Sequence, residues 1–286
     1  MLITPNRQDL NKIVVINPKG GCGKTTLSTN LAAYFAKRGP VPAVMDCDPQ
    51  GSSMTWIERR PTQNPPIHGI AAYKRTMQAT RSWQLRVPNE TTNLIVDSPA
   101  SLSHEDLREV TRDASSILVP VMPSSIDIHA ASRCIADLLL VAKVDRREKK
   151  LAVVANRTRA NTKSFEKLMR FLDSLGIPII AVLRDSQNFV HAAEEGIGIC
   201  EMTPYKVKKD MVELEKIVEW LEGWKERRQR TSETSIIEQT PNETILRKPS
   251  FGTTKPARIS ANNPATMIPP LSTTTDDLSI VSRFPP

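Results

Sequence analysis

NPKGGCGKTT, residues 17–26, is the stretch that indicates the fold of this chain. A β-branched run, KIVVIN (12–17), precedes the glycines, and apolar residues at helical spacing follow as far as Gly39. In a strand, glycine-rich turn and helix, backbone N–H groups and the positive helix end can cradle a polyphosphate. Glycines let the backbone approach the phosphate oxygens. The stretch therefore predicts a phosphate-binding loop made of Gly20, Gly21, Cys22, Gly23, Lys24, Thr25 and Thr26.

The loop departs from the usual phosphate-loop pattern, G-x-x-x-x-G-K-[ST]. Pro18 stands where that pattern has its first glycine, and an extra lysine, Lys19, stands directly before Gly20. We assign Lys24 to the β- and γ-phosphates of a nucleotide and the Thr25 hydroxyl to Mg²⁺. A glycine-rich turn with chance lysines is the alternative, and the flanking strand and helix argue against it.

Composition narrows the class of protein. The chain has 286 residues, a net charge of +8 and four scattered cysteines without a C-x-x-C pair. We expect a reduced, cytoplasmic protein without a disulfide framework, a structural metal, a signal peptide or a transmembrane segment. The positive charge favours an acidic partner, either nucleic acid or an anionic membrane.

Short apolar runs alternate with helical patterns along residues 12–230. This alternation predicts an α/β fold, with a doubly wound, mostly parallel sheet covered by helices on both faces. Pro42 conflicts with its run, because proline removes a ladder donor. The expected strands are 12–17, 41–47, 93–98, 116–121, 151–156 and 177–182, with a weaker one at 68–73.

Three segments are expected. Residues 1–11 form an N-terminal extension, residues 12–230 the nucleotide-binding domain, and residues 231–286 a tail rich in Ser, Thr and Pro. The tail holds five acidic and five basic residues, so the net charge lies in residues 1–230. Its composition predicts disorder.

Three carboxylates follow predicted strands. Asp46 and Asp48 end the second run in MDCDPQGSS, and Asp97 ends NLIVDS. Ligands of parallel sheets bind at the carboxyl ends of strands, and phosphate-loop enzymes hold or orient Mg²⁺ with carboxylates there. Acidic residues also form turns, but their place beside a phosphate loop favours a magnesium site.

The sequence resembles the ParA and MinD family of deviant Walker ATPases, a group of P-loop NTPases. KGGCGKT matches the signature loop, DCDPQGSS the second motif and DSPA the third, over roughly residues 12–225. The resemblance implies slow ATP hydrolysis with ATP and Mg²⁺ as cofactors, and an ATP-sandwich homodimer. It also implies that Lys19 crosses to the partner's nucleotide, as an arginine finger does elsewhere.

Further roles come from the same resemblance. Asp48 would position the attacking water, Asp46 would support the magnesium-bound switch, and Asp97 would orient Mg²⁺ through water. Asn156, in VVANR, would read adenine. The DNA-binding region of ParA-type members resembles 183–198, which implies sequence-independent DNA contacts by Arg184 and by the nearby cluster Lys206, Lys208 and Lys209.

No helix-turn-helix precedes the loop, so the chain is similar to the short members. Their cargo is a plasmid, a chromosome origin, a chemoreceptor cluster or a carboxysome, and DPQGSSMTWIERRP and TRSWQLRVP are most similar to members that distribute carboxysomes. The resemblance implies a nucleoid-associated protein with a small ParB-like or McdB-like activating partner.

Two other functions remain open from the sequence. A MinD-like member would bind a membrane through an amphipathic helix, for which 211–230 is the candidate. The alternative is that the apolar face of this helix packs on the domain. The five glutamates of the segment disfavour binding to anionic lipid. An iron–sulfur carrier would need a bridging cysteine pair, which the chain lacks.

Overall fold

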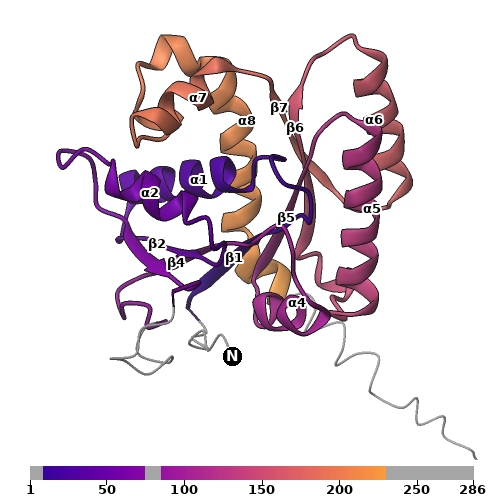
Figure 1. The fold of residues 1–286 in the computed structure, drawn as a ribbon, viewed down its shortest axis with the longest axis horizontal. Helices are drawn as coiled ribbons and strands as arrows, with labels where there is room; N and C mark the ends of the chain where they lie inside the picture. The colour runs from indigo at the N-terminus through magenta and orange to yellow at the C-terminus, as the bar shows by residue number, and fades with distance from the viewer. Residues whose placement is uncertain (1–8, 75–84, 230–286) are drawn as a thin grey trace, which may run out of the picture. The chain divides into compact units, whose positions relative to one another are not determined.

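The computed structural model describes residues 9–74 and 85–229 (Figure 1). A seven-stranded sheet with the order β3-β2-β4-β1-β5-β6-β7 forms the centre, and every neighbouring pair of strands is parallel. The prediction of a doubly wound parallel sheet is confirmed. The strands are β1 Asn11–Val15, β2 Ala43–Asp46, β3 His68–Ala71, β4 Asn93–Asp97, β5 Ser116–Val121, β6 Leu151–Thr158 and β7 Ile179–Arg184.

Helices cover both faces of this sheet, as the apolar strands require. Along β1, Val14 packs into one hydrophobic cluster, and Ile13 and Val15 pack into the other. One cluster includes residues of α4 (His104–Thr111), α5 (Ser125–Leu140) and α6 (Lys163–Ser174). The other includes residues of α1 (Lys24–Arg38), α2 (Ser52–Glu58), α7 (Gln187–Glu194) and α8 (Pro204–Glu222).

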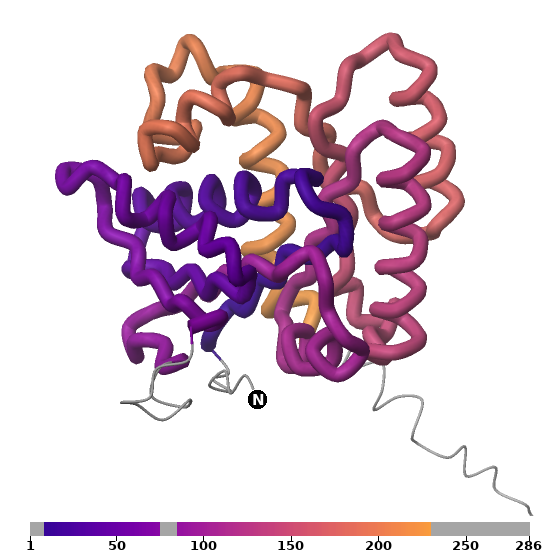
Figure 2. Tube along the Cα trace, in the orientation of Figure 1, coloured from indigo at the N-terminus to yellow at the C-terminus, as the bar shows by residue number. Residues whose placement is uncertain are grey.

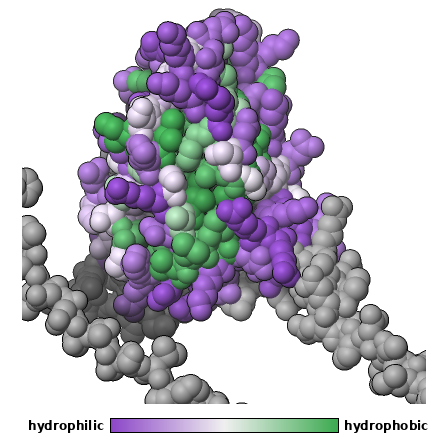
Figure 3. Space-filling view, turned by 90° about the vertical axis from the view of Figure 1, so that its right-hand side faces the viewer, coloured by the Kyte–Doolittle hydropathy of each residue, from purple (hydrophilic) through white to green (hydrophobic). Residues whose placement is uncertain are grey.

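The trace runs from β1 through the phosphate loop directly into α1, as Figure 2 shows. On the face that carries α5 and α6, apolar side chains form a band bordered by hydrophilic ones (Figure 3). Ile126 and Leu140, at the two ends of α5, are 70% and 78% exposed. Within the residues that the structure describes, no helix combines the length and apolar character needed to cross a bilayer.

Pro42 causes no conflict with the sheet. β2 begins at Ala43, so Pro42 precedes the ladder and loses no donor. Its carbonyl oxygen accepts a hydrogen bond from the N–H of His68 at 2.9 Å. The proline therefore still contributes an acceptor where β2 and β3 begin to pair.

Two helical features go beyond the sequence expectation. α7 lies in the segment 183–198, for which the sequence predicted only DNA contacts, and the last helix begins at Pro204, earlier than residue 211. Proline suits that first position because its missing N–H is unpaired there anyway. The predicted tail, 231–286, lies outside the described residues.

Candidate functional site

The phosphate loop joins β1 to α1 through glycines with left-handed backbone angles. Gly21 has φ 77° and Gly23 has φ 97°. A Cβ atom at Gly23 would lie 2.1 Å from Nδ2 of Asn156, so any other residue would displace the Asn156 side chain and strain the backbone. Gly23 also caps α1 without a side-chain bond. The first N–H groups of α1 therefore face the loop, where they can bind an anion.

Side chains hold the loop in shape. Nδ2 of Asn17, which is fully buried, donates to the carbonyl oxygen of Pro120 at 2.7 Å, and its Oδ1 accepts from the N–H of Lys19 at 2.9 Å. Nζ of Lys24, 7% exposed, donates to the carbonyl oxygen of Lys19 at 3.3 Å. The Lys24 ammonium is thus held across the loop, while the Lys19 side chain is only partly buried.

Asp97 lies at the centre of the predicted magnesium site. Its Oδ2 accepts hydrogen bonds from Oγ1 of Thr25 at 2.7 Å and from Oγ of Ser53 at 2.6 Å. Its Oδ1 is buried and has no hydrogen-bond partner among the described residues. Burial raises the pKa of Asp97 to about 6, although the hydrogen bonds from the Ser53 and Thr25 hydroxyls act to lower it.

These oxygens fit a magnesium ion. Mg²⁺ prefers oxygen ligands and is usually held by one or two carboxylates together with phosphates and water. The Thr25 hydroxyl and the unpaired Oδ1 of Asp97 supply two such oxygens beside the phosphate loop. Thr25 would hold the ion, and Asp97 would orient it.

Asp46 organises the segment after β2. Its Oδ2 accepts from the N–H groups of Ser53 and Met54, at 3.0 and 3.2 Å, and its Oδ1 from that of Asp48 at 3.0 Å. Burial raises the pKa of Asp46. Asp46 thus fixes both the start of α2 and the backbone of Asp48, which is partly exposed and whose Oδ1 accepts from the N–H of Gln50 at 3.0 Å.

Asn156 connects β6 to the phosphate loop. Its Nδ2 donates to the carbonyl oxygen of Cys22 at 2.8 Å, and its Oδ1 accepts from the N–H of Arg157 at 2.9 Å. A bulge in β6 between Ala155 and Thr158, with Arg157 at φ 48°, directs the asparagine inward. Asn156 lines a cleft of about 320 Å³ together with Thr26, Arg157, Arg184, Asp185, Phe189 and Val190.

A family model described as the CobQ/CobB/MinD/ParA nucleotide binding domain matches residues 13–199. The chain belongs to this family. It is similar to the "Maintenance of carboxysome distribution protein A" of Halothiobacillus neapolitanus, with 28% identity over 194 residues, 66% of this chain and 87% of that protein. The protein of the same name from Gloeobacter kilaueensis is 29% identical over 224 residues, 73% of this chain and 93% of that protein.

Its fold is similar to that of Cyanothece McdA in complex with ATP. The TM-score is 0.56 at 16% identity, over 77% of this chain and 96% of that one. Membership in the CobQ/CobB/MinD/ParA family shows a nucleotide-binding domain over residues 13–199, and the predicted phosphate loop, residues 20–26, lies within it. The recognition of a ParA- and MinD-type ATPase from the sequence is confirmed.

The residues predicted to contact DNA lie on two elements. Lys206, Lys208 and Lys209 are exposed on α8. Arg184 ends β7, and its Nε and Nη2 donate to the buried carboxylate of Asp210 at 2.6 and 2.9 Å. The Arg184 side chain is 47% exposed, so part of it remains accessible to solvent although it is paired with Asp210. Its DNA contact stays a prediction.

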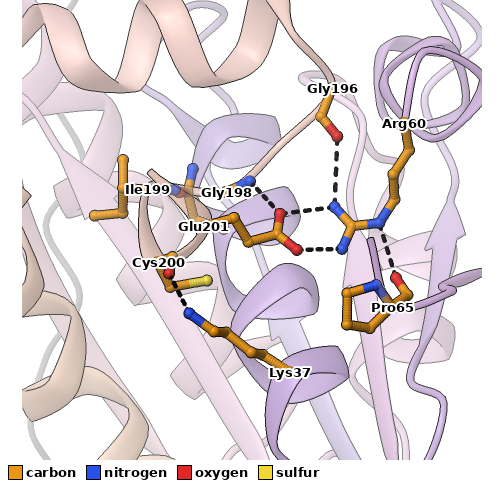
Figure 4. Close-up of polar contacts among 9 residues, drawn as sticks. Lys37, Arg60, Pro65, Gly196, Gly198, Ile199, Cys200 and Glu201 are labelled. Carbon is orange, nitrogen blue, oxygen red and sulfur yellow. Dashed lines mark hydrogen bonds and ion pairs between the residues drawn. The ribbon is translucent and has the colours of Figure 1, made fainter. Parts of the chain in front are cut away.

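A buried ion pair connects α2 to the segment after α7. Nη2 and Nη1 of Arg60 donate to the two oxygens of Glu201 at 2.5 and 2.9 Å, with side-chain exposures of 5% and 6% (Figure 4). Nε of Arg60 donates to the carbonyl oxygen of Pro65 at 2.9 Å, and the N–H of Gly198 donates to Glu201 at 2.8 Å. The pair fixes the end of α2 to the short helix η2 (Ile199–Glu201).

Several residues of the site were not predicted. Asn17 and Ser53 are short polar side chains next to motif residues. Their place in the sequence was the only feature that could have indicated their hydrogen bonds. Asp127, near the start of α5, has Oδ2 bonded by the Ser124 hydroxyl, while its buried Oδ1 has no hydrogen-bond partner among the described residues. Arg60 and Glu201 are 141 residues apart, so their pairing has no local sequence signal.

Proposed function

We propose that this protein is a ParA-type ATPase that dimerises on ATP, binds DNA without sequence preference and positions a cargo. The observation that carries the ATPase part is the convergence of Thr25, Ser53 and Asp97 beside Lys24. This arrangement supports the proposal, because a hydroxyl and an unpaired carboxylate oxygen beside the loop are ligands that a nucleotide-bound Mg²⁺ could use.

Each residue then has a separate role in hydrolysis. Lys24 and the N–H groups at the start of α1 bind the phosphates, and Asn156 contacts the base. Bound Mg²⁺ would neutralise charge on the β- and γ-phosphates. Asp48, fixed by Asp46, orients the attacking water, and Lys19 of each protomer stabilises charge on the nucleotide of the other.

The exposed lysines of α8 support DNA binding. Lys206, Lys208 and Lys209 supply phosphate contacts without a base-reading element, and dimerisation doubles their number. The relatives from Halothiobacillus and Gloeobacter carry the name of carboxysome distribution proteins, which supports a carboxysome as cargo and a small activating partner. In this model, hydrolysis releases the protein from the nucleoid.

A MinD-like membrane protein is the alternative. It would need the apolar stripe of α8 to reach lipid. Leu214, Ile217, Val218 and Leu221 of that stripe are at most 1% exposed and pack in the hydrophobic cluster with α1. The packing of α8 therefore favours DNA over lipid as the partner.

The ATPase is tested by turnover with ATP and GTP. We expect slow, Mg²⁺-dependent hydrolysis of ATP, stimulated by DNA together with a partner, and at least tenfold slower turnover of GTP. Asp48→Ala should abolish hydrolysis, whereas Asp173→Ala, at an exposed position of α6, should not. Equal turnover of GTP, or full activity of Asp48→Ala, would contradict the proposal.

A further inference from the structure

A cavity of about 400 Å³ lies at the end of the sheet opposite to the phosphate loop. Leu151, the first residue of β6, lines this cavity, whereas Asn156 of the same strand lines the nucleotide-side cleft. Asn156 is five positions further along the strand than Leu151, which corresponds to about 17 Å. We call it the Trp220 cavity, and it is distinct from the nucleotide site.

The wall of the Trp220 cavity is largely apolar. Leu139, Leu151, Ile177, Pro178 and Trp220 line it. Leu140, the neighbour of Leu139 at the end of α5, is 78% exposed. A concave apolar surface of this size is within the range of ligand pockets, about 300–1,000 Å³. The cavity is therefore large enough, and apolar enough, to hold a side chain of a ligand.

Cations outnumber carboxylates around the cavity. Arg146, Lys149 and Arg227 line it, with Asp145 as the one acidic residue of the described lining. The Oδ1 of Asp145 already accepts the N–H of Arg147 at 2.8 Å. The lining therefore has a positive balance, and it favours a negatively charged ligand.

Two of these cations are held in place by the fold. Nη2 of Arg227 donates to Oγ of Ser116 at 2.9 Å, and its guanidinium lies 4.0 Å from the centroid of the Trp220 ring. Burial lowers the pKa of Arg227 to about 10, so this group remains protonated at neutral pH. Nη1 of Arg146 donates to the carbonyl oxygen of Leu175 at 3.3 Å.

We propose that the Trp220 cavity is a docking site for an acidic peptide segment of a partner protein. An aliphatic or aromatic side chain of the peptide enters the cavity against Trp220, and flanking carboxylates pair with Arg146 and Lys149. Tryptophan and arginine are the residues most enriched at the energetic centre of protein interfaces. DNA phosphates would use the cations alone and would leave the apolar wall exposed.

Selection from a random peptide library on the full chain tests this proposal. The double variant Arg146→Glu with Lys149→Glu serves for counter-selection. Lys143→Glu with Arg147→Glu, exposed and outside the described lining, is the control with the same charge change. We expect selected peptides to carry Asp or Glu on both sides of a Leu, Ile, Phe or Trp.

Fluorescence anisotropy of the best peptide then measures affinity. We expect a loss of at least tenfold with the Arg146/Lys149 variant, less than twofold with the control, and at least tenfold when the peptide's carboxylates become amides or its apolar residue becomes Ser. Lys24→Ala should bind the peptide as wild type does, so this test is independent of the proposed ATPase.

Three outcomes would overturn the docking site. The first is a selection in which no peptide distinguishes wild type from the Arg146/Lys149 variant. The second is a set of selected peptides without carboxylates. The third is displacement of the peptide by a short DNA duplex at low concentration, which would make the cavity part of a nucleic-acid surface.

Discussion

Asp97 is the residue whose protonation should govern magnesium binding. Burial raises its pKa to about 6, so the carboxyl is protonated below that pH and ionised above it. Mg²⁺ requires the ionised form. We therefore expect the affinity for Mg-ADP to fall as the pH drops below about 6. Calorimetric titration at several pH values measures this dependence, and Asp97→Asn should reduce it to the part that comes from protonation of the ADP phosphate.

The same pKa predicts an effect on stability without metal. A carboxyl whose pKa is raised by folding stabilises the fold below its unfolded pKa, about 3.9, and this contribution is lost as the pH rises through about 6. In the absence of Mg²⁺, Asp97→Asn should therefore melt at a higher temperature than wild type at pH 7, and the two should converge near pH 4. A wild type that is more stable at pH 7 would exclude this explanation.

The two lysines of the loop should separate binding from turnover. Lys24 is held inside the loop, so Lys24→Ala should abolish nucleotide binding. Lys19 is partly exposed, and Lys19→Ala should bind ATP in the monomer yet fail to dimerise or hydrolyse it. Nucleotide titration and sizing with a slowly hydrolysed ATP analogue measure the two steps. Normal dimerisation and turnover of Lys19→Ala would refute its role in trans.

For single residues, the sequence identifies the motif residues better than the neighbouring residues that fix their positions by hydrogen bonds. Lys24, Thr25 and Asp97 were predicted because each stands at a fixed offset from a glycine or a strand end. Asn17 and Ser53 hold them through hydrogen bonds to Pro120 and Asp97, which are distant in the chain. Such contacts depend on the register of neighbouring strands, which no local pattern specifies.

Among the elements, α2 depends on the buried pair of Arg60 and Glu201. Removing one partner leaves a buried charge, so Glu201→Ala should lower the free energy of unfolding by about 3–5 kcal/mol. Replacing both, as Arg60→Met with Glu201→Leu, should recover most of this loss. Urea denaturation of the single and double variants measures the difference.

The exposed pair of Arg38 and Glu222 is the matched control. Its side chains are 54% and 53% exposed, so Glu222→Ala should cost less than about 1 kcal/mol. Similar losses for Glu201→Ala and Glu222→Ala would show that burial of the Arg60 pair adds nothing to stability.

Element types were more predictable than element ends. The seven strands follow from apolar runs, whereas the bulge in β6 leaves no mark in VVANRT. α7 lies in a segment for which the sequence predicted only DNA contacts, and its eight residues include a single fully buried side chain, Ala192. Its start is set by the Ser186 side chain, which accepts the N–H of Asn188 at 3.3 Å.

At the scale of the whole molecule, the predicted phosphate loop and the lysines predicted to contact DNA lie on different elements, so the proposed switch would have to link them. β6 and β7 end at the nucleotide-side cleft, and Arg184 at the end of β7 is paired with Asp210 of α8. α8 therefore contacts the nucleotide side through this pair while it carries the lysines. This ion pair between β7 and α8 supports the proposal that ATP controls the affinity of the protein for DNA.

DNA binding should therefore require ATP, ignore sequence and fall steeply with salt. Each phosphate contact lowers the slope of log affinity against log salt concentration by about 0.9, and the proposed dimer would double the contacts of the monomer. Replacing Lys206, Lys208 and Lys209 by Ala should make this slope less steep and lower the affinity without preventing ATP-driven dimerisation.

The control replaces Lys143, Lys163 and Lys167, which are exposed elsewhere and carry the same charge. A salt series of DNA binding with ATP and with ADP, beside liposome sedimentation, measures the effect. Equal binding with both nucleotides would contradict the switch, and ATP-dependent liposome binding without DNA binding would favour the MinD-like alternative.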